Sequence, residues 1–122
     1  MIEDLTKKSD ERGTLIELFK LPGVGQVFYS TTKPGYTRGN HYHLRKIERF
    51  CVIGGSGEIT LRDRVSGEIK SVLVSGEKPQ VVDMPINWAH NIKNVGDKEM
   101  KLIIWVNEVF DPKNSDTYPE QV

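Results

Sequence analysis

Short apolar stretches alternate with polar turns along most of the 122-residue chain. Between residues 58 and 64, Ile59 and Leu61 alternate with Thr60 and Arg62, which is the two-residue period of a half-buried strand. Glycine, proline, asparagine or charged residues separate this run from others of the same kind. The pattern predicts strands at 14–19, 27–32, 40–43, 47–53, 58–64, 69–74, 81–84, 89–93 and 100–106.

The close spacing of these strands indicates the fold class. No amphipathic helical stretch separates them, and parallel pairing would need crossover connections of about a dozen residues or more, for which there is no room. We therefore expect an all-β sandwich or barrel that forms a single domain over residues 1–122. The polar tail at 111–122 contains two prolines, and we expect it to run over the surface or to dock on a neighbour.

Charge and composition argue against several kinds of partner. Lysine plus arginine and aspartate plus glutamate number 17 each, so no overall basic field would attract nucleic acid or an anionic membrane. No apolar run approaches the roughly 20 residues of a membrane span, and we expect no signal peptide, because Glu3, Asp4 and Lys7 follow the first residues. The single cysteine, Cys51, excludes an internal disulfide framework and predicts a cytoplasmic protein.

Three histidines and one glutamate carry the strongest chemical signal. His41 and His43 are two residues apart, so on a strand their side chains point to the same face. Glu48 opens an apolar strand on which it shares a face with Phe50, and a buried carboxylate there is costly unless it is paired or bound to a metal. Imidazoles and a carboxylate suit zinc, iron, nickel or manganese. The alternative is a surface or core histidine pair without a metal.

Two motifs in order resemble those of the cupin superfamily. The first is Gly-Asn-His-x-His, four residues, Glu, six residues and Gly, at 39–55; the second is Pro, four residues, His, three residues and Asn, at 85–94. Asn87 stands where the second motif usually has glycine, and asparagine tolerates positive φ better than most residues. The resemblance implies a jelly-roll barrel that binds one metal ion, with Zn2+ expected and Fe2+, Ni2+ or Mn2+ as alternatives. Its ligands would be His41, His43, Glu48 and His90.

A narrower resemblance suggests a reaction. Asp-Glu-Arg-Gly at 10–13 is similar to the opening of the dTDP-4-keto-6-deoxyhexose 3,5-epimerases. The segments at 33–43, 81–85, 90–92 and 105–112 are similar to the C-terminal cupin domain of capsular polysaccharide assembling proteins. This likeness implies epimerisation at C3 of a nucleotide-linked 4-keto-6-deoxyhexose in surface polysaccharide biosynthesis, on a zinc-bearing barrel.

The same resemblance implies roles for individual residues. Arg12 and Arg38 are candidates for the substrate's pyrophosphate, because the arginine fork can donate two hydrogen bonds to it. His41 corresponds to a catalytic base of the epimerases, but a histidine bound to a metal cannot also take a proton. The base would then be a metal-bound hydroxide or a tyrosine, such as Tyr36 or the less favourably oriented Tyr42.

The sequence also carries expectations about partners. It has no Gly-x-Gly-x-x-Gly for a dinucleotide, so a separate reductase would be needed for the step after epimerisation. Because an open sheet edge needs covering, we expect a homodimer. Two other functions compete with the epimerase: an iron cupin dioxygenase, and a non-catalytic sugar-binding subunit in which the ion is structural.

Overall fold

Eleven β-strands and no helix make up the protein, whose computed structural model describes residues 1–122. The all-β prediction is therefore confirmed. The sequence pattern missed the first and last strands and began the fourth three residues too late, at Asn40 instead of Thr37. The strands are β1 (Lys7–Asp10), β2 (Gly13–Leu21), β3 (Gly25–Thr32), β4 (Thr37–Tyr42), β5 (Glu48–Gly54), β6 (Ser56–Asp63), β7 (Ile69–Ser75), β8 (Val81–Met84), β9 (Trp88–Asn94), β10 (Met100–Val106) and β11 (Tyr118–Pro119).

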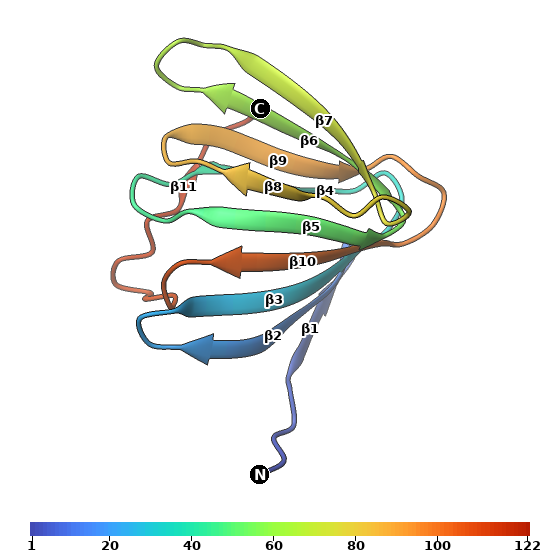
Figure 1. Ribbon diagram of the computed structural model, residues 1–122, viewed down its shortest axis with the longest axis vertical. Helices are drawn as coiled ribbons and strands as arrows, with labels where there is room; N and C mark the ends of the chain where they lie inside the picture. The colour runs from blue at the N-terminus through green and yellow to red at the C-terminus, as the bar shows by residue number, and fades with distance from the viewer.

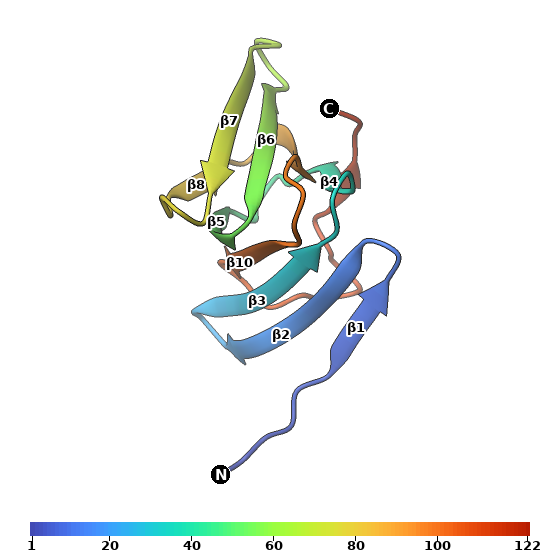
Figure 2. The same cartoon turned by 90° about the vertical axis from the view of Figure 1, so that its right-hand side faces the viewer.

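The strands form two antiparallel sheets. One sheet has the order β1-β2-β3-β10-β5-β8 and the other β11-β4-β9-β6-β7. Figure 1 shows β2, β3, β10 and β5 side by side, and Figure 2 shows the two sheets inclined to one another. Strands next to each other in sequence often lie in different sheets, as β4 and β5 do, so the chain crosses repeatedly between the layers. The structure contains no helix with the length and apolar character needed to cross a membrane.

The core lies between the two sheets and follows from strand alternation. Along β5, Phe50 and Val52 are buried while the neighbouring Arg49 and Ile53 are exposed. These side chains meet apolar residues of the other sheet in one cluster of nine: Phe50, Val52, Ile59, Leu61, Val74, Met84, Ile92, Met100 and Leu102. The inward face of β5 begins with Glu48, so the same alternation that builds the core also brings a carboxylate to its end.

The C-terminal tail packs against the chain's own second sheet. β11 pairs with the end of β4, with Tyr118 opposite Tyr42 and Pro119 opposite His41. The backbone amide of Glu120 donates to the carbonyl of Asn40 at 2.9 Å. Residue polarity alone did not predict this docking, because it depends mainly on backbone groups that β4 leaves free at the sheet edge.

Candidate metal centre

The four predicted ligands come from three neighbouring strands and the turn after one of them. His41 lies near the end of β4, His43 just beyond it, and His90 on β9, where it is the register partner of His41. Glu48 is the first residue of β5 in the opposite sheet. The side chains therefore meet across the gap between the two sheets.

A β-bulge in β4 sets the position of His41. The register against β9 shifts between Gly39 and His41, and Gly39 and Asn40 both have positive φ, of 99° and 59°. A Cβ on Gly39 would lie 2.9 Å from the carbonyl oxygen of His90, so this position favours glycine. The side-chain oxygen of Asn40 accepts a hydrogen bond from Nδ2 of Asn91 at 3.0 Å, which ties the bulge to β9.

The ligand atoms converge on one point. One atom from each of the four side chains lies within 4.8 Å of the others. Oε1 of Glu48 is 2.7 Å from Nε2 of His43 and 3.2 Å from Nε2 of His90. Around a tetrahedral zinc with bonds of about 2.0–2.1 Å, neighbouring ligand atoms are about 3.4 Å apart. The cluster is therefore of the right size to hold one such ion.

The hydrogen bonds of the histidines leave their Nε2 atoms for a metal. Nδ1 of His43 donates to the carbonyl of Asp116 at 2.7 Å, and Nδ1 of His90 donates to the carbonyl of Trp88 at 3.2 Å. Nε2 of His90 is buried and has no hydrogen-bond partner, although Glu48 lies close to it. A buried polar atom without a partner is costly, and a metal ion would satisfy it. The residues present thus fit a divalent ion.

The protonation behaviour agrees with this donor set. Burial, reinforced by the nearby His90, lowers the pKa of His41 to about 4, so its imidazole is neutral at pH 7. Burial would raise the pKa of Glu48, but the imidazoles of His43 and His90 outweigh it and lower that pKa to about 2. Burial alone would lower the pKa of His43, yet its bond to Glu48 raises it. In the metal-free protein the raised pKa favours a proton on His43, between the carbonyl of Asp116 and the carboxylate of Glu48.

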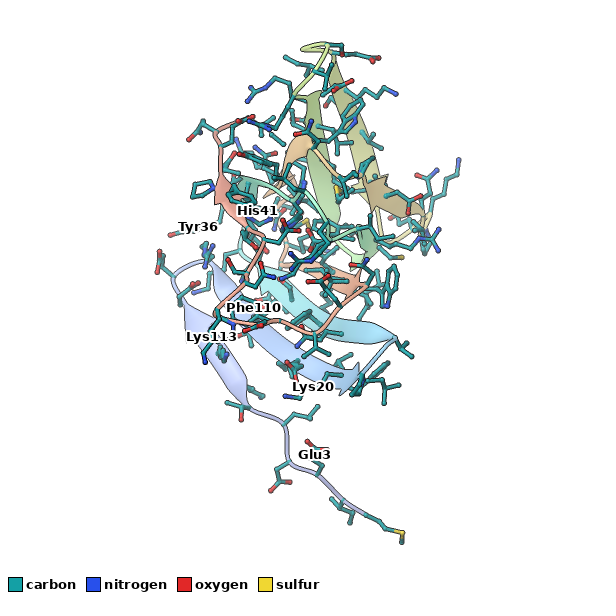
Figure 3. The ribbon with its side chains drawn as sticks, turned by 90° about the vertical axis from the view of Figure 1, so that its left-hand side faces the viewer. Glu3, Lys20, Tyr36, His41, Phe110 and Lys113 are labelled. Atoms are coloured by element: carbon teal, nitrogen blue, oxygen red, sulfur yellow. The ribbon has the colours of Figure 1, made fainter.

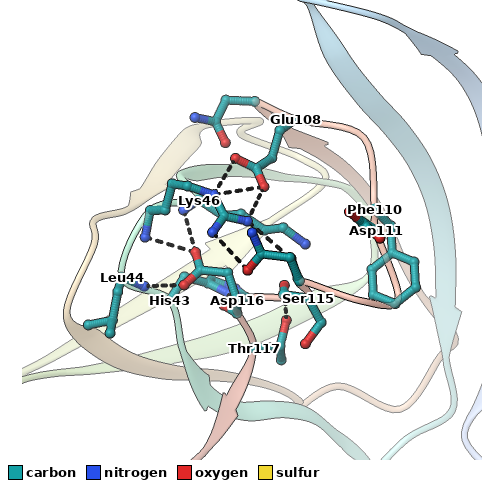
Figure 4. A network of polar contacts seen from close by, with 12 residues as sticks. His43, Leu44, Lys46, Glu108, Phe110, Asp111, Ser115, Asp116 and Thr117 are labelled. Atoms are coloured by element: carbon teal, nitrogen blue, oxygen red, sulfur yellow. Dashed lines mark hydrogen bonds and ion pairs between the residues drawn. The ribbon is translucent and has the colours of Figure 1, made fainter.

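Asp116 holds the turn that carries His43. Its carboxylate accepts hydrogen bonds from three successive backbone amides, those of Leu44, Arg45 and Lys46, at 3.0, 2.8 and 2.7 Å. Figure 4 shows these contacts converging on Asp116, whose own carbonyl accepts from His43. The residue is 5% exposed and has a φ of 51°. A tail residue therefore fixes both the turn and the ring of a predicted ligand.

The cluster opens into a cavity of about 330 Å³. Phe110 and the C-terminal segment close one side of it; in Figure 3 this segment runs from Phe110 and Lys113 towards the strand that carries His41. Sequence reasoning missed the wall of this cavity. The only feature of the sequence that pointed to Lys46 was its position two residues before Glu48, because alternate residues of a strand share a face. Nothing in the pattern of the tail indicated Asp116. Besides three of the ligands, the polar and aromatic lining consists of Lys8, Glu17, Gln26, Phe28, Lys46, Phe110 and Thr117.

The other predicted residues lie outside this cavity lining. Arg12 pairs with Asp10 at 2.7 Å, whereas Arg38 donates to the carbonyl of Thr31 at 2.9 Å. Burial, and then the proximity of Arg12, lower the pKa of Arg38, so the two arginines are neighbours. The side chain of Tyr36 is 41% exposed. The structure thus brings the four ligands together and places both arginines in a separate group.

The fold, with its two antiparallel sheets, is that of a single-domain cupin barrel. A solved structure of oxalate decarboxylase from Lactobacillus farciminis superimposes with a TM-score of 0.72 at 18% identity over 85% of this chain and 31% of that one, a likeness in fold alone. The capsular polysaccharide assembling protein CapF from Staphylococcus aureus superimposes with a TM-score of 0.95 and 45% identity, over 99% of this chain and 33% of that protein.

The chain belongs to the polysaccharide biosynthesis C-terminal domain family, which it matches over residues 8–118. It is 42% identical over 115 residues to a UDP-2-acetamido-2,6-beta-L-arabino-hexul-4-ose reductase of Pseudomonas aeruginosa, covering 94% of this chain and 31% of that protein. It is 27% identical over 127 residues to the probable low-salt glycan biosynthesis epimerase Agl13 of Haloferax volcanii, covering 94% of this chain and 81% of that protein. The chain thus spans about a third of the length of CapF and of the reductase.

Proposed function

We propose that the protein is a metal-dependent C3 epimerase of a nucleotide-linked 4-keto-6-deoxyhexose in surface polysaccharide biosynthesis. The observation that carries the proposal is the cluster of His41, His43, Glu48 and His90, which opens into a cavity in a member of a polysaccharide biosynthesis family. The names of two relatives, a reductase of a UDP-linked hexul-4-ose and a glycan biosynthesis epimerase, agree with a keto-sugar substrate.

The reaction requires a proton to leave C3 and return to the opposite face. The C4 carbonyl makes this possible, because the electron pair of the C3–H bond moves onto its oxygen. A divalent ion held by the four ligands would supply Lewis acidity at that oxygen. Three neutral imidazoles and one carboxylate favour zinc, with Fe2+, Ni2+ and Mn2+ as alternatives.

Substrate binding is assigned to residues of two regions. The cavity beside the ligands would take the keto sugar, and Arg12 and Arg38 would take the pyrophosphate. Two neighbouring guanidinium groups suit a pyrophosphate. Arg12 would first have to break its ion pair with Asp10, so that both N–H donors of its guanidinium could bind the phosphate oxygens.

Proton transfer is assigned to His41 or Tyr36. His41 has the better position, but it can take a proton only when its lone pair is free of the metal. Tyr36 would need to move towards the cavity, because its side chain is outside the lining. The variant Tyr36→Phe distinguishes the two residues. Loss of exchange at C3 would assign the proton transfer to Tyr36, and retained exchange would show that Tyr36 does not transfer the proton.

The product would pass to a reductase, the activity for which the relative from Pseudomonas aeruginosa is named. We expect both steps in the cytoplasm, where a lone thiol such as Cys51 stays reduced.

One experiment tests the function. Purified protein of known metal content is incubated in deuterium oxide with a UDP- or dTDP-linked 4-keto-6-deoxyhexose, and C3 and C5 are followed by NMR. We expect deuterium at C3, and a loss of exchange in Glu48→Gln. Absence of exchange with every such sugar, in protein that holds its metal, would overturn the proposal.

A further inference from the structure

Lys46 lies in the wall of the metal-site cavity, with a largely buried side chain and no carboxylate paired with its ammonium. Its residue is 5% exposed, and its ammonium makes neither a hydrogen bond nor an ion pair. The nearest partner is the ring of Phe110, whose centroid lies 5.1 Å from Nζ. Nζ is not one of the fully buried polar atoms, and Lys46 belongs to the cavity lining, so its charge is accessible to a ligand in the cavity.

None of the surrounding acids forms a hydrogen bond or an ion pair with the Lys46 ammonium. Glu108 is held by Arg45, whose Nε donates to its two carboxylate oxygens at 3.1 and 2.9 Å. Glu17, which also lines the cavity, accepts from Nε2 of Gln26 at 2.7 Å. Glu48 is engaged by the imidazoles of the cluster.

The backbone of Lys46 is fixed in place. Its amide donates to Oδ2 of Asp116 at 2.7 Å, as Figure 4 shows, in the same set of contacts that holds the turn after His43. The lysine and a predicted metal ligand are therefore oriented by one residue. This rigidity is what a preorganised electrostatic site requires.

We propose that Lys46 forms an anion-binding subsite beside the metal ligands, which takes the substrate oxygen that becomes negative during the reaction. A divalent ion with one carboxylate and three neutral imidazoles keeps a charge of +1, and Lys46 raises the charge of the cavity to +2. Such a cavity favours an anionic oxygen. On the proposed function, which this inference extends, that oxygen is the C4 oxygen when the C3–H bond breaks and its electron pair moves onto the carbonyl.

Three variants test the assignment through catalysis. Lys46→Met keeps the length of the side chain and removes the charge, Lys46→Arg keeps the charge, and Lys93→Met changes an exposed lysine on β9. We expect Lys46→Met to lower kcat for exchange at C3 at least tenfold, with KM within twofold and the metal content unchanged. Lys46→Arg should retain more activity than Lys46→Met, and Lys93→Met should match the parent. Unchanged kinetics, or a raised KM with normal kcat, would overturn the assignment.

A stability measurement separates this role from a structural one. Because the ammonium makes no hydrogen bond or ion pair that the fold would lose, metal-free Lys46→Met should melt at the same temperature as the parent or above it. A clear loss of stability would show that the lysine serves the fold and would contradict the proposal.

Anion binding provides a readout that does not depend on the reaction. The cobalt-loaded protein is titrated with azide, and the visible absorption of the cobalt reports binding. We expect Lys46→Met to weaken azide at least fivefold relative to the parent and to Lys93→Met. If the parent shows no deuterium exchange at C3 but its azide affinity depends on Lys46, the epimerase proposal is wrong and the anion-binding subsite is supported. Equal azide affinity in the parent and in Lys46→Met would show that Lys46 forms no such subsite.

Discussion

The imidazole of His43 donates through Nδ1 to the backbone carbonyl of Asp116, 73 residues further along the chain, at 2.7 Å. This bond fixes the tautomer of a predicted metal ligand, so that Nε2 faces Glu48 and the other histidines. Asp116 reaches this position because its carboxylate is itself bound by the turn after His43.

Replacement of Asp116 by alanine should weaken both the metal site and the fold. The variant leaves three backbone amides without their acceptor, at a cost of about 1–3 kcal/mol, and loosens the orientation of His43. We expect the metal affinity to fall about 10–100-fold, as for other groups that orient a ligand. Competition with a chromophoric chelator measures it. Asp116→Asn is the matched control, since asparagine also tolerates positive φ and this variant should lose less metal affinity than Asp116→Ala. Equal metal affinities in the parent and both variants would show that Asp116 does not orient His43.

Glu48→Gln should release the metal while leaving the fold intact. The amide removes the one negative charge from the ligand set, so the content of bound zinc or iron after purification should fall well below one equivalent. Elemental analysis measures it, with Glu99→Gln, at an exposed position, as the control. Full occupancy in Glu48→Gln would show that this carboxylate is not a ligand.

The metal-free protein should lose stability as the pH falls. His41 has a pKa of about 4 against 6.5 in the unfolded chain, so the unfolded state binds its proton first and stability declines between pH 6.5 and 4. Glu48 adds a further decline in stability between pH 4.5 and about 2, because its pKa is about 2 in the folded state. His43 acts in the opposite sense: its raised pKa adds stability below pH 6.5 that is lost as the pH rises through the folded value. Urea unfolding of metal-free protein and of His41→Gln tests this, and the variant should show a flatter decline between pH 6.5 and 4. Identical slopes would contradict the depressed pKa.

Replacement of Asn87 by glycine should cost less stability than its replacement by alanine. Its φ is 61°, its amide donates to the carbonyl of His43 at 2.7 Å, and its side-chain oxygen accepts from Arg64 at 2.7 Å. Asn87→Gly keeps the backbone conformation and loses only the contact with Arg64. Asn87→Ala adds left-handed strain of about 1–2 kcal/mol. Thermal unfolding should rank asparagine and glycine above alanine, and an alanine variant as stable as glycine would show that the turn relaxes.

The protein should be a homodimer. β1 lies at the edge of its sheet with all four residues exposed, and the preceding residues extend away from the strands in Figures 1 and 2. An exposed edge of this kind is a ready pairing surface. Light scattering after size exclusion should give twice the mass of the 13.9 kDa chain, and a monomeric mass at all concentrations would refute the expectation.

The sequence by itself determined most of the strands, the fold class and, through the two motifs, the four side chains that converge. Strand alternation is a local property, so the two-residue spacing of His41 and His43, and the shared face of Glu48 and Phe50, follow from the chain order alone. The positive φ of Asn87 agrees with the resemblance to the second cupin motif, which usually has glycine at this position.

Only the tertiary structure decided what surrounds the metal ligands. Asp116 and Phe110 lie far from His43 in sequence, and their contacts depend on the path of a tail with no strong periodic pattern. Burial is a collective property of both sheets, so the exposed fraction of Lys46 and its lack of a counterion could not be read from its neighbours in the chain. Local pattern and motif spacing thus indicated the predicted ligands, whereas long-range packing set the hydrogen bonds of their imidazoles, their pKa values and the cation beside them.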